Sequence, residues 1–280
     1  MAQRLLFIFL LYSVSVFSQS NKNQTFKLLG SINSDTGSVT LRQITFSDFY
    51  PGIERNLSTK IVNGSFLFEG NLKNPLGFEI SFNNSYYSNM FIIEPGSRSI
   101  SIDLNSTDKM PKITNTSMND QNEYLLAFHE LDIKKKLFNK KYDSLVATYK
   151  KNLPERIKLE LADEIKASYI AQDKVFLKYV KSHPDSYFAL WKFVRLNGFG
   201  YEEIFDSIFN SFSKPLRNSE TGKKLSRYLE RERKIFIGAK FPKIAVVNMK
   251  GEKNNSLTFV KKFTLIDFWY SNCMPCIAQF

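Results

Sequence analysis

The stretch Leu265-Ile-Asp-Phe-Trp-Tyr-Ser-Asn-Cys-Met-Pro-Cys-Ile-Ala278 contains both cysteines of the chain. Only two residues separate Cys273 from Cys276, and an apolar run typical of a β-strand precedes them. A strand that leads into a helix would place the first sulfur at the helix N-terminus, where free backbone N–H groups and the helix dipole stabilise a thiolate. The spacing therefore predicts a reactive dithiol, with Cys273 as the attacking sulfur and Cys276 as the resolving one.

Zinc binding is the alternative function for a Cys-x-x-Cys pair. A zinc site needs a second cysteine pair or histidine partners, and the only histidines, His129 and His183, lie far from the pair in sequence. Neither histidine has a neighbouring serine, cysteine or carboxylate motif, so surface or capping roles are the simpler interpretation. We therefore expect no metal and no cofactor, apart from a redox-active disulfide between Cys273 and Cys276.

Residues 238–280 resemble a known family. They begin with a Gly-x-x-Phe-Pro lead at Gly238, and an apolar run at 263–269 ends in Asp267-Phe268-Trp269, just before Cys273-Met-Pro-Cys276. This order resembles the thioredoxin superfamily, specifically the TlpA/ResA-like thiol–disulfide oxidoreductases of the bacterial envelope. The order of the whole chain also resembles those members of the group that carry an uncharacterised β-domain and a helical segment ahead of the thioredoxin domain.

The resemblance implies roles for two further residues. Asp267 corresponds to a buried carboxylate beneath the cysteine pair, which accepts a proton from Cys276 during resolution. Pro275 has no N–H and a fixed φ, and so shapes the first helical turn. Two positions depart from the family pattern: Asn272 stands where tryptophan is common, and Met274 replaces a smaller residue.

The resemblance also implies an enzyme that reduces or exchanges disulfides in exported proteins and receives electrons from a membrane thiol donor. A thioredoxin fold needs further strands and a cis-proline loop after Cys276, so we expect residues 238–280 to be the N-terminal part of a C-terminally truncated domain. The activity then belongs to the parent protein. The main alternative is a non-catalytic envelope binding protein with a vestigial thioredoxin remnant. A peroxidase is disfavoured, because its cysteine would be expected in a Thr-x-x-Cys setting.

The N-terminus has the pattern of an export signal. A charged start at Gln3-Arg4 precedes the apolar run Leu5–Phe17, which is shorter than the roughly 20 residues that span a bilayer. We predict a signal peptide at 1–18 that is cleaved ahead of Gln19. No cysteine lies near this cut for lipidation. The sequence thus predicts an exported protein of the periplasm or cell envelope, without an integral membrane span after cleavage.

The remaining chain contains a β-rich part followed by a helical one. Residues 24–112 predict a small antiparallel β-sandwich or barrel, with a type I′ turn at Asn63-Gly64. Residues 118–236 predict an all-α segment. The clearest expected elements are strands at Phe26–Leu29, Val39–Ile44, Leu76–Phe82, Met90–Glu94 and Ser99–Asp103, and helices at Tyr124–Tyr149, Pro154–Val180, Ser186–Leu196, Glu202–Phe212 and Ser219–Lys234. The predicted fold class is therefore α+β and multidomain, ending in an incomplete thioredoxin-like α/β domain.

The formal net charge of +12 raises the question of nucleic-acid binding. The lysine clusters, Lys134-Lys-Lys136 and Lys223-Lys224 among them, fall on expected helices and alternate with acidic residues. Such a pattern favours a solvated helical face, and an exported protein rarely meets nucleic acid. We therefore predict no nucleic-acid partner, whereas attraction to anionic lipids or to an acidic partner stays open.

Overall fold

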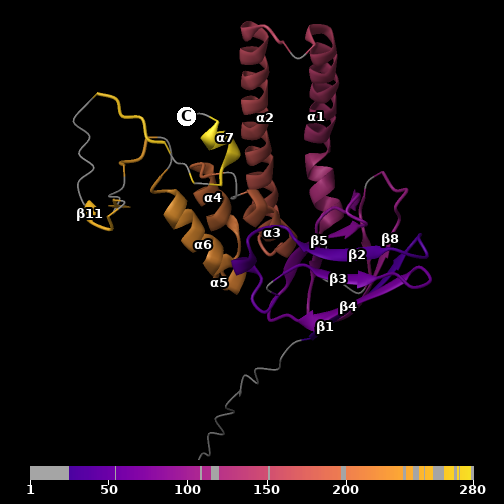
Figure 1. The fold of residues 1–280 in the computed structure, drawn as a ribbon. Helices are drawn as coiled ribbons and strands as arrows, with labels where there is room; N and C mark the ends of the chain where they lie inside the picture. The colour runs from indigo at the N-terminus through magenta and orange to yellow at the C-terminus, as the bar shows by residue number, and fades with distance from the viewer. Residues whose placement is uncertain are drawn as a thin grey trace, which may run out of the picture. The chain divides into compact units, whose positions relative to one another are not determined.

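The computed structural model describes residues 25–53, 55–107, 109–114, 120–150, 152–196, 200–235, 238–241, 246–248, 250–254, 262–267, 270 and 272–278 (Figure 1). The signal peptide expected at 1–18 lies outside these residues. The chain divides into two compact units, one up to Arg233 and one from Lys234. The β-rich part and the helical part together form the first unit, and the cysteine pair belongs to the second.

The β-rich part begins the first unit and contains two sheets. One has the strand order β4-β1-β8-β9, and the other has the order β3-β2-β5-β6, with β7 also paired to β5. A short 3-10 helix, η1, covers Ser47–Phe49. The strands are β1 Thr25–Ile32, β2 Ser38–Gln43, β3 Leu57–Lys60, β4 Ser65–Asn71, β5 Leu76–Phe82, β6 Tyr86–Tyr87, β7 Phe91–Ile93, β8 Gly96–Ile102 and β9 Lys112–Ile113.

The first sheet is mixed, so the expectation of a purely antiparallel β-domain was wrong. β1 pairs antiparallel with β4 but parallel with β8, with Phe26 opposite Gly96 and Ile32 opposite Ile102. The two parallel strands are far apart in sequence, and the strands of the second sheet are formed between them. Along β1 every second side chain is buried, as the alternation of apolar and polar residues predicts.

The predicted turn at Asn63-Gly64 is confirmed, but the strands on either side do not form a simple hairpin. Asn63 and Gly64 have φ values of 50° and 72°, and Val62 and Ser65 exchange two backbone hydrogen bonds. A type I′ turn requires such positive φ values, which asparagine and glycine tolerate. Beyond the turn, β3 pairs with β2 and β4 pairs with β1. The turn therefore joins the two sheets.

The helical part comes after the β-rich part, and its helices lie close to the ranges that the sequence predicts. Ser219 caps α6, since its Oγ accepts a hydrogen bond from the Gly222 N–H at 3.1 Å. His183 ends α2 and stacks on Tyr179, with ring centroids 4.3 Å apart. The capping role expected of His183 is thus confirmed. The helices are α1 Gln121–Tyr149, α2 Glu155–Ser182, α3 Tyr187–Leu196, α4 Ile204–Ser211, α5 Lys214–Asn218 and α6 Glu220–Glu232.

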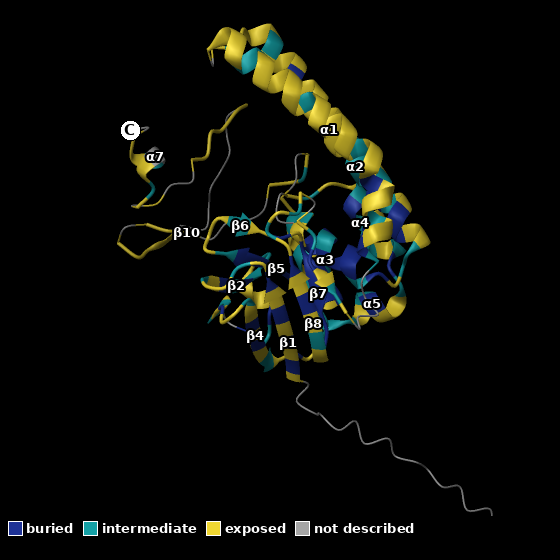
Figure 2. Ribbon diagram, turned by 90° about the vertical axis from the view of Figure 1, so that its right-hand side faces the viewer, coloured by how far each residue is buried: buried dark blue, intermediate teal, exposed yellow. Residues whose placement is uncertain are grey.

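The helices α1 and α2 lie side by side and antiparallel (Figure 1). Near the β-rich part they bury Phe128, Phe176 and Tyr179, whereas most of α1 is exposed (Figure 2). The exposed surface includes the lysines at 134–136, as predicted for a solvated helical face. It also includes apolar side chains, of which Leu126 is 76% exposed.

Asp173 on α2 makes the stability of the first unit depend on pH. Burial, and then the nearby Glu202, raise the pKa of the Asp173 carboxyl to about 6 from an ordinary 3.8. Below pH 3.8 both the folded and the unfolded state hold the proton, so no penalty exists. As the pH rises to 6 the unfolded state ionises first, and the folded state loses stability.

Asp173→Asn should therefore raise the free energy of unfolding at neutral pH by about 1 kcal/mol, once solvent screening at this half-exposed site is allowed for. Urea unfolding at neutral pH and near pH 3.8 measures the effect, and the gain should vanish at the lower pH. Asp163→Asn, an exposed change on the same helix, is the matched control and should alter stability little. A gain of equal size at both pH values would contradict the prediction.

The second unit contains three short described elements: β10 Val246–Val247, β11 Lys253–Asn254 and α7 Met274–Ile277. β10 and β11 pair antiparallel. The strand expected at 263–269 is not found in its described part, residues 263–267, where Phe263 and Leu265 are 82% and 95% exposed. No described strand pairs with these residues, so their backbone lacks the hydrogen-bonded ladder that defines a strand. None of the described helices is both long and apolar enough to cross a membrane.

Candidate active site

Cys273 lies at the start of α7, where the sequence places it. It is the N-cap residue, with extended backbone, and its carbonyl accepts a hydrogen bond from the Ile277 N–H at 2.9 Å. The Ala278 N–H donates to the Met274 carbonyl at 3.0 Å, which completes one helical turn. Pro275 belongs to this first turn, where the absence of its N–H leaves no hydrogen bond unmade. The local sequence therefore suffices to form the turn that carries the pair.

The two cysteines form a disulfide, with their Cα atoms 5.2 Å apart. The Cys276 N–H donates a hydrogen bond to Cys273 Sγ at 3.3 Å. In the reduced protein the same N–H would face the Cys273 sulfur, and a donor in this position favours the thiolate over the thiol. Both cysteines are half-buried. The geometry suits a dithiol that opens and closes at the start of a helix.

The surroundings of the pair are exposed. Met274 between the cysteines is 73% exposed, and Tyr270, whose carbonyl accepts from the Cys273 N–H at 3.0 Å, is 65% exposed. Asn272, which directly precedes Cys273, is exposed as well. An incoming disulfide would therefore meet little steric obstruction from these side chains.

Asp267 is exposed, so the expectation of a buried carboxylate beneath the cysteines was wrong. Burial would require packed neighbours, and residues 263–267 form no strand that could bring them. Phe268 and Trp269, which complete the predicted motif, lie outside the described residues. The structure thus places Cys273, Cys276 and the Pro275 backbone together in one turn, and it does not bury Asp267.

The two histidines lie on helices of the first unit, His129 within α1 and His183 at the end of α2. His129 is exposed on α1, and His183 Nε2 lies 2.9 Å from Glu123 Oε2. Among the described residues, no group of three or more histidine, cysteine, aspartate or glutamate side chains is arranged to hold a metal ion.

Four cationic side chains form a further feature, which sequence reasoning missed. Lys214, Arg217, Lys223 and Arg227 line one hollow between α4, α5 and α6. The spacing of Lys223 and Arg227 by four residues puts both on one helix face, and this is the signal that could have revealed half of the group. The other half comes from α5, and only the packing of the two helices brings the halves together.

A comparison with protein families gave a match in the β-rich part. Residues 26–122 match the family described as "Domain of unknown function (DUF4369)". The matched stretch contains the two sheets and the beginning of α1, and it ends far before Cys273. No curated protein and no solved structure matches the chain.

Proposed function

We propose that the protein is a thiol–disulfide oxidoreductase of the cell envelope, with Cys273 as the nucleophile and Cys276 as the resolving cysteine. The observation that carries the proposal is the disulfide at the start of α7, in which the Cys276 N–H donates to Cys273 Sγ. The sequence pattern Asp267-Phe268-Trp269 before Cys273-Met-Pro-Cys276 adds the resemblance to TlpA/ResA-like proteins. The family match at 26–122 falls on the part for which this resemblance implies an uncharacterised β-domain.

The reaction proceeds in two exchange steps. The Cys273 thiolate attacks one sulfur of a substrate disulfide, which forms a mixed disulfide and releases one substrate thiolate. Cys276 then loses its proton and attacks Cys273 Sγ, which forms the Cys273–Cys276 disulfide and releases the second substrate thiolate. Two electrons pass from the dithiol to the substrate. A thiol donor at the membrane returns the pair to the reduced state by the reverse exchange.

The position of Cys273 explains why it attacks first. The N–H that faces its sulfur would stabilise the thiolate, which is the form that attacks a disulfide. Asp267 remains the proposed proton acceptor for Cys276, and the partners remain disulfide-bearing exported proteins. An exposed Asp267 would have to approach Cys276 to act directly, or would act through water.

Cysteine variants of the full-length parent protein test the proposal. Cys276→Ser should trap a mixed disulfide with a disulfide-bearing substrate such as insulin, because the resolving sulfur is gone. Cys273→Ser should trap none and should reduce insulin no faster than a protein-free control. Met274→Ala, which keeps both sulfurs and removes an exposed side chain, is the matched control and should behave as the unaltered chain does. Equal insulin reduction by the Cys273→Ser variant and the unaltered chain would refute the proposal.

A non-catalytic binding protein is the second candidate. The exposed apolar side chains on the helix pair α1 and α2 favour it, since Leu137 and Leu159 are each 60% exposed and Tyr169 is 64% exposed. Exposed apolar residues of this kind are common at sites of protein association. Failure of both cysteine variants to change insulin reduction would leave this candidate as the better one.

A further inference from the structure

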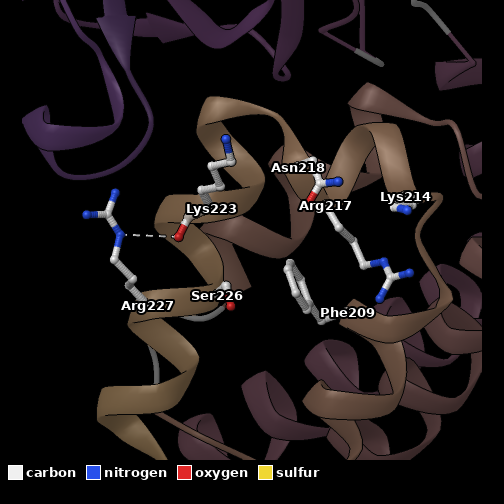
Figure 3. Close-up of a pocket in the computed structure, with 7 residues that line it drawn as sticks. All are labelled: Phe209, Lys214, Arg217, Asn218, Lys223, Ser226 and Arg227. Atoms are coloured by element: carbon white, nitrogen blue, oxygen red, sulfur yellow. Dashed lines mark hydrogen bonds between the residues drawn. The ribbon is translucent and has the colours of Figure 1, made fainter.

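The hollow between α4, α5 and α6 has a volume of about 690 Å³ and an unusual lining. Figure 3 shows Lys223 and Arg227 on one side and Lys214 and Arg217 on the other, with the Phe209 ring between them. Two neutral polar side chains, Asn218 and Ser226, complete the lining. The volume lies in the range of pockets that hold small organic ligands.

The four cations have no counter-charge in the part of the chain that the structure describes. None of them forms an ion pair with a carboxylate there, and no acidic residue lines the hollow. Nearby acids already have other partners: Glu220 binds Lys224 and Asn74, and Asp206 binds Arg233. Like charges gathered around one hollow repel one another, and an anion in the hollow would relieve that repulsion.

A second observation concerns Arg217. Its Nε atom is buried and has no hydrogen-bond acceptor among the described residues. A buried guanidinium N–H without an acceptor is costly, and a ligand in the hollow would supply one once the Arg217 side chain turns toward it. By contrast, Arg227 Nε donates to the backbone carbonyl of Lys223 at 3.3 Å, which fixes the Arg227 side chain along α6 (Figure 3).

We propose that this hollow is a binding site for a ligand that carries two phosphate groups. A phosphate ester holds nearly two negative charges at neutral pH, so two such groups balance four cations, whereas a single carboxylate balances one. Arginine suits the bidentate recognition of phosphate oxygens, and lysine adds a flexible charge. The half-buried Phe209 between the two cationic pairs would contact the apolar or ring part of the ligand that joins its two phosphates. The site is independent of the cysteine chemistry.

Calorimetric titration of the full chain tests the site with two soluble probes. Fructose 1,6-bisphosphate should bind saturably and about tenfold or more tightly than inorganic phosphate, because only the bisphosphate reaches both cationic pairs. Its affinity should fall as the salt concentration rises. Vesicles of phosphatidylcholine with and without phosphatidylinositol 4,5-bisphosphate, whose headgroup carries two phosphomonoesters on one ring, form a second arm. Binding to the acidic vesicles alone, lost in the variants below, would identify the phosphates as those of a lipid headgroup.

Two variants locate the binding. Lys223→Gln with Arg227→Gln removes the exposed pair on α6 and should weaken bisphosphate binding, or vesicle binding, at least about tenfold. Lys214 is exposed on α5, and Lys214→Gln alone should also weaken bisphosphate binding. This single variant provides the test if the double variant unfolds. The matched control, Lys134→Gln with Lys135→Gln on α1, removes the same charge elsewhere and should leave binding unchanged. The proposal is overturned if neither probe nor vesicle binds, or if the control pair weakens binding as much as the hollow variants do.

Discussion

Trp191→Ala should lower the free energy of unfolding of the first unit by about 3–5 kcal/mol. Trp191 is fully buried, and its ring lies between α3 and the second sheet. Its ring centroid is 5.2 Å from that of Tyr50, and a Cβ placed on Gly77 would lie 2.9 Å from its Cδ2 atom. The glycine on β5 therefore makes room for the indole, and removal of the indole would leave a cavity that rigid strands cannot close.

Hydrogen bonds fix the same contact. Trp191 Nε1 donates to the Pro75 carbonyl at 3.2 Å, and the Tyr50 hydroxyl donates to the Gly77 carbonyl at 2.6 Å. Trp191→Phe keeps much of the ring but loses the first bond, so it should cost less than Trp191→Ala. Urea unfolding measures both. Tyr169→Ala, which truncates a ring 64% exposed on α2, is the matched control and should cost under about 1 kcal/mol. A similar small loss for Trp191→Ala would contradict the packing argument.

Gly222→Ala should destabilise the protein by about 3 kcal/mol, although helix propensity alone predicts the opposite sign. Gly222 lies in the first turn of α6, where a Cβ would collide with the Leu216 carbonyl oxygen and would lie 2.6 Å from the Arg217 carbonyl oxygen. Both obstructing atoms belong to the backbone at the end of α5, which cannot rotate away as a side chain would. The methyl group must therefore push α5 and α6 apart.

The sign of the change in stability distinguishes steric obstruction between α5 and α6 from the effect of helix propensity. Alanine in place of glycine in an unobstructed helix raises stability by about 1 kcal/mol, so a gain would show that the two helices do not touch as described. Glu230→Ala, at an exposed position of α6, controls for changes in helix propensity and should have little effect. If the proposed hollow binds phosphate, Gly222→Ala should also weaken bisphosphate binding, because Arg217 moves with α5.

Local sequence signals predicted much of the fold. The Asn63-Gly64 turn, the end of α2 close to the predicted Val180 and the start of α6 close to the predicted Ser219 each depend on conformations that a few neighbouring residues determine. The periodicities of the helices and of β1 follow from the same short-range geometry. These features were therefore accessible before any tertiary contact was known.

Pairing between distant segments was not accessible in this way. The sequence predicts a turn between β3 and β4, but it does not reveal that they belong to different sheets or that β1 lies parallel to β8. Apolar residues on β1 must be buried whichever strands flank it, so the hydrophobic pattern is equally consistent with several partners. The choice depends on how residues of both sheets and of the helices pack into one hydrophobic core.

At the cysteine pair, the sequence by itself determined the disulfide turn, because a proline in the first turn and two residues between the sulfurs suffice to place Cys273 at the start of α7. It did not determine the environment of Asp267, because burial of this carboxylate would require other strands to pack against residues 263–267. The cationic hollow was likewise decided only by tertiary structure. Lys214 and Arg217 meet Lys223 and Arg227 because Gly222 lets α5 pack against α6, and such a contact between helices leaves no periodic trace in the sequence.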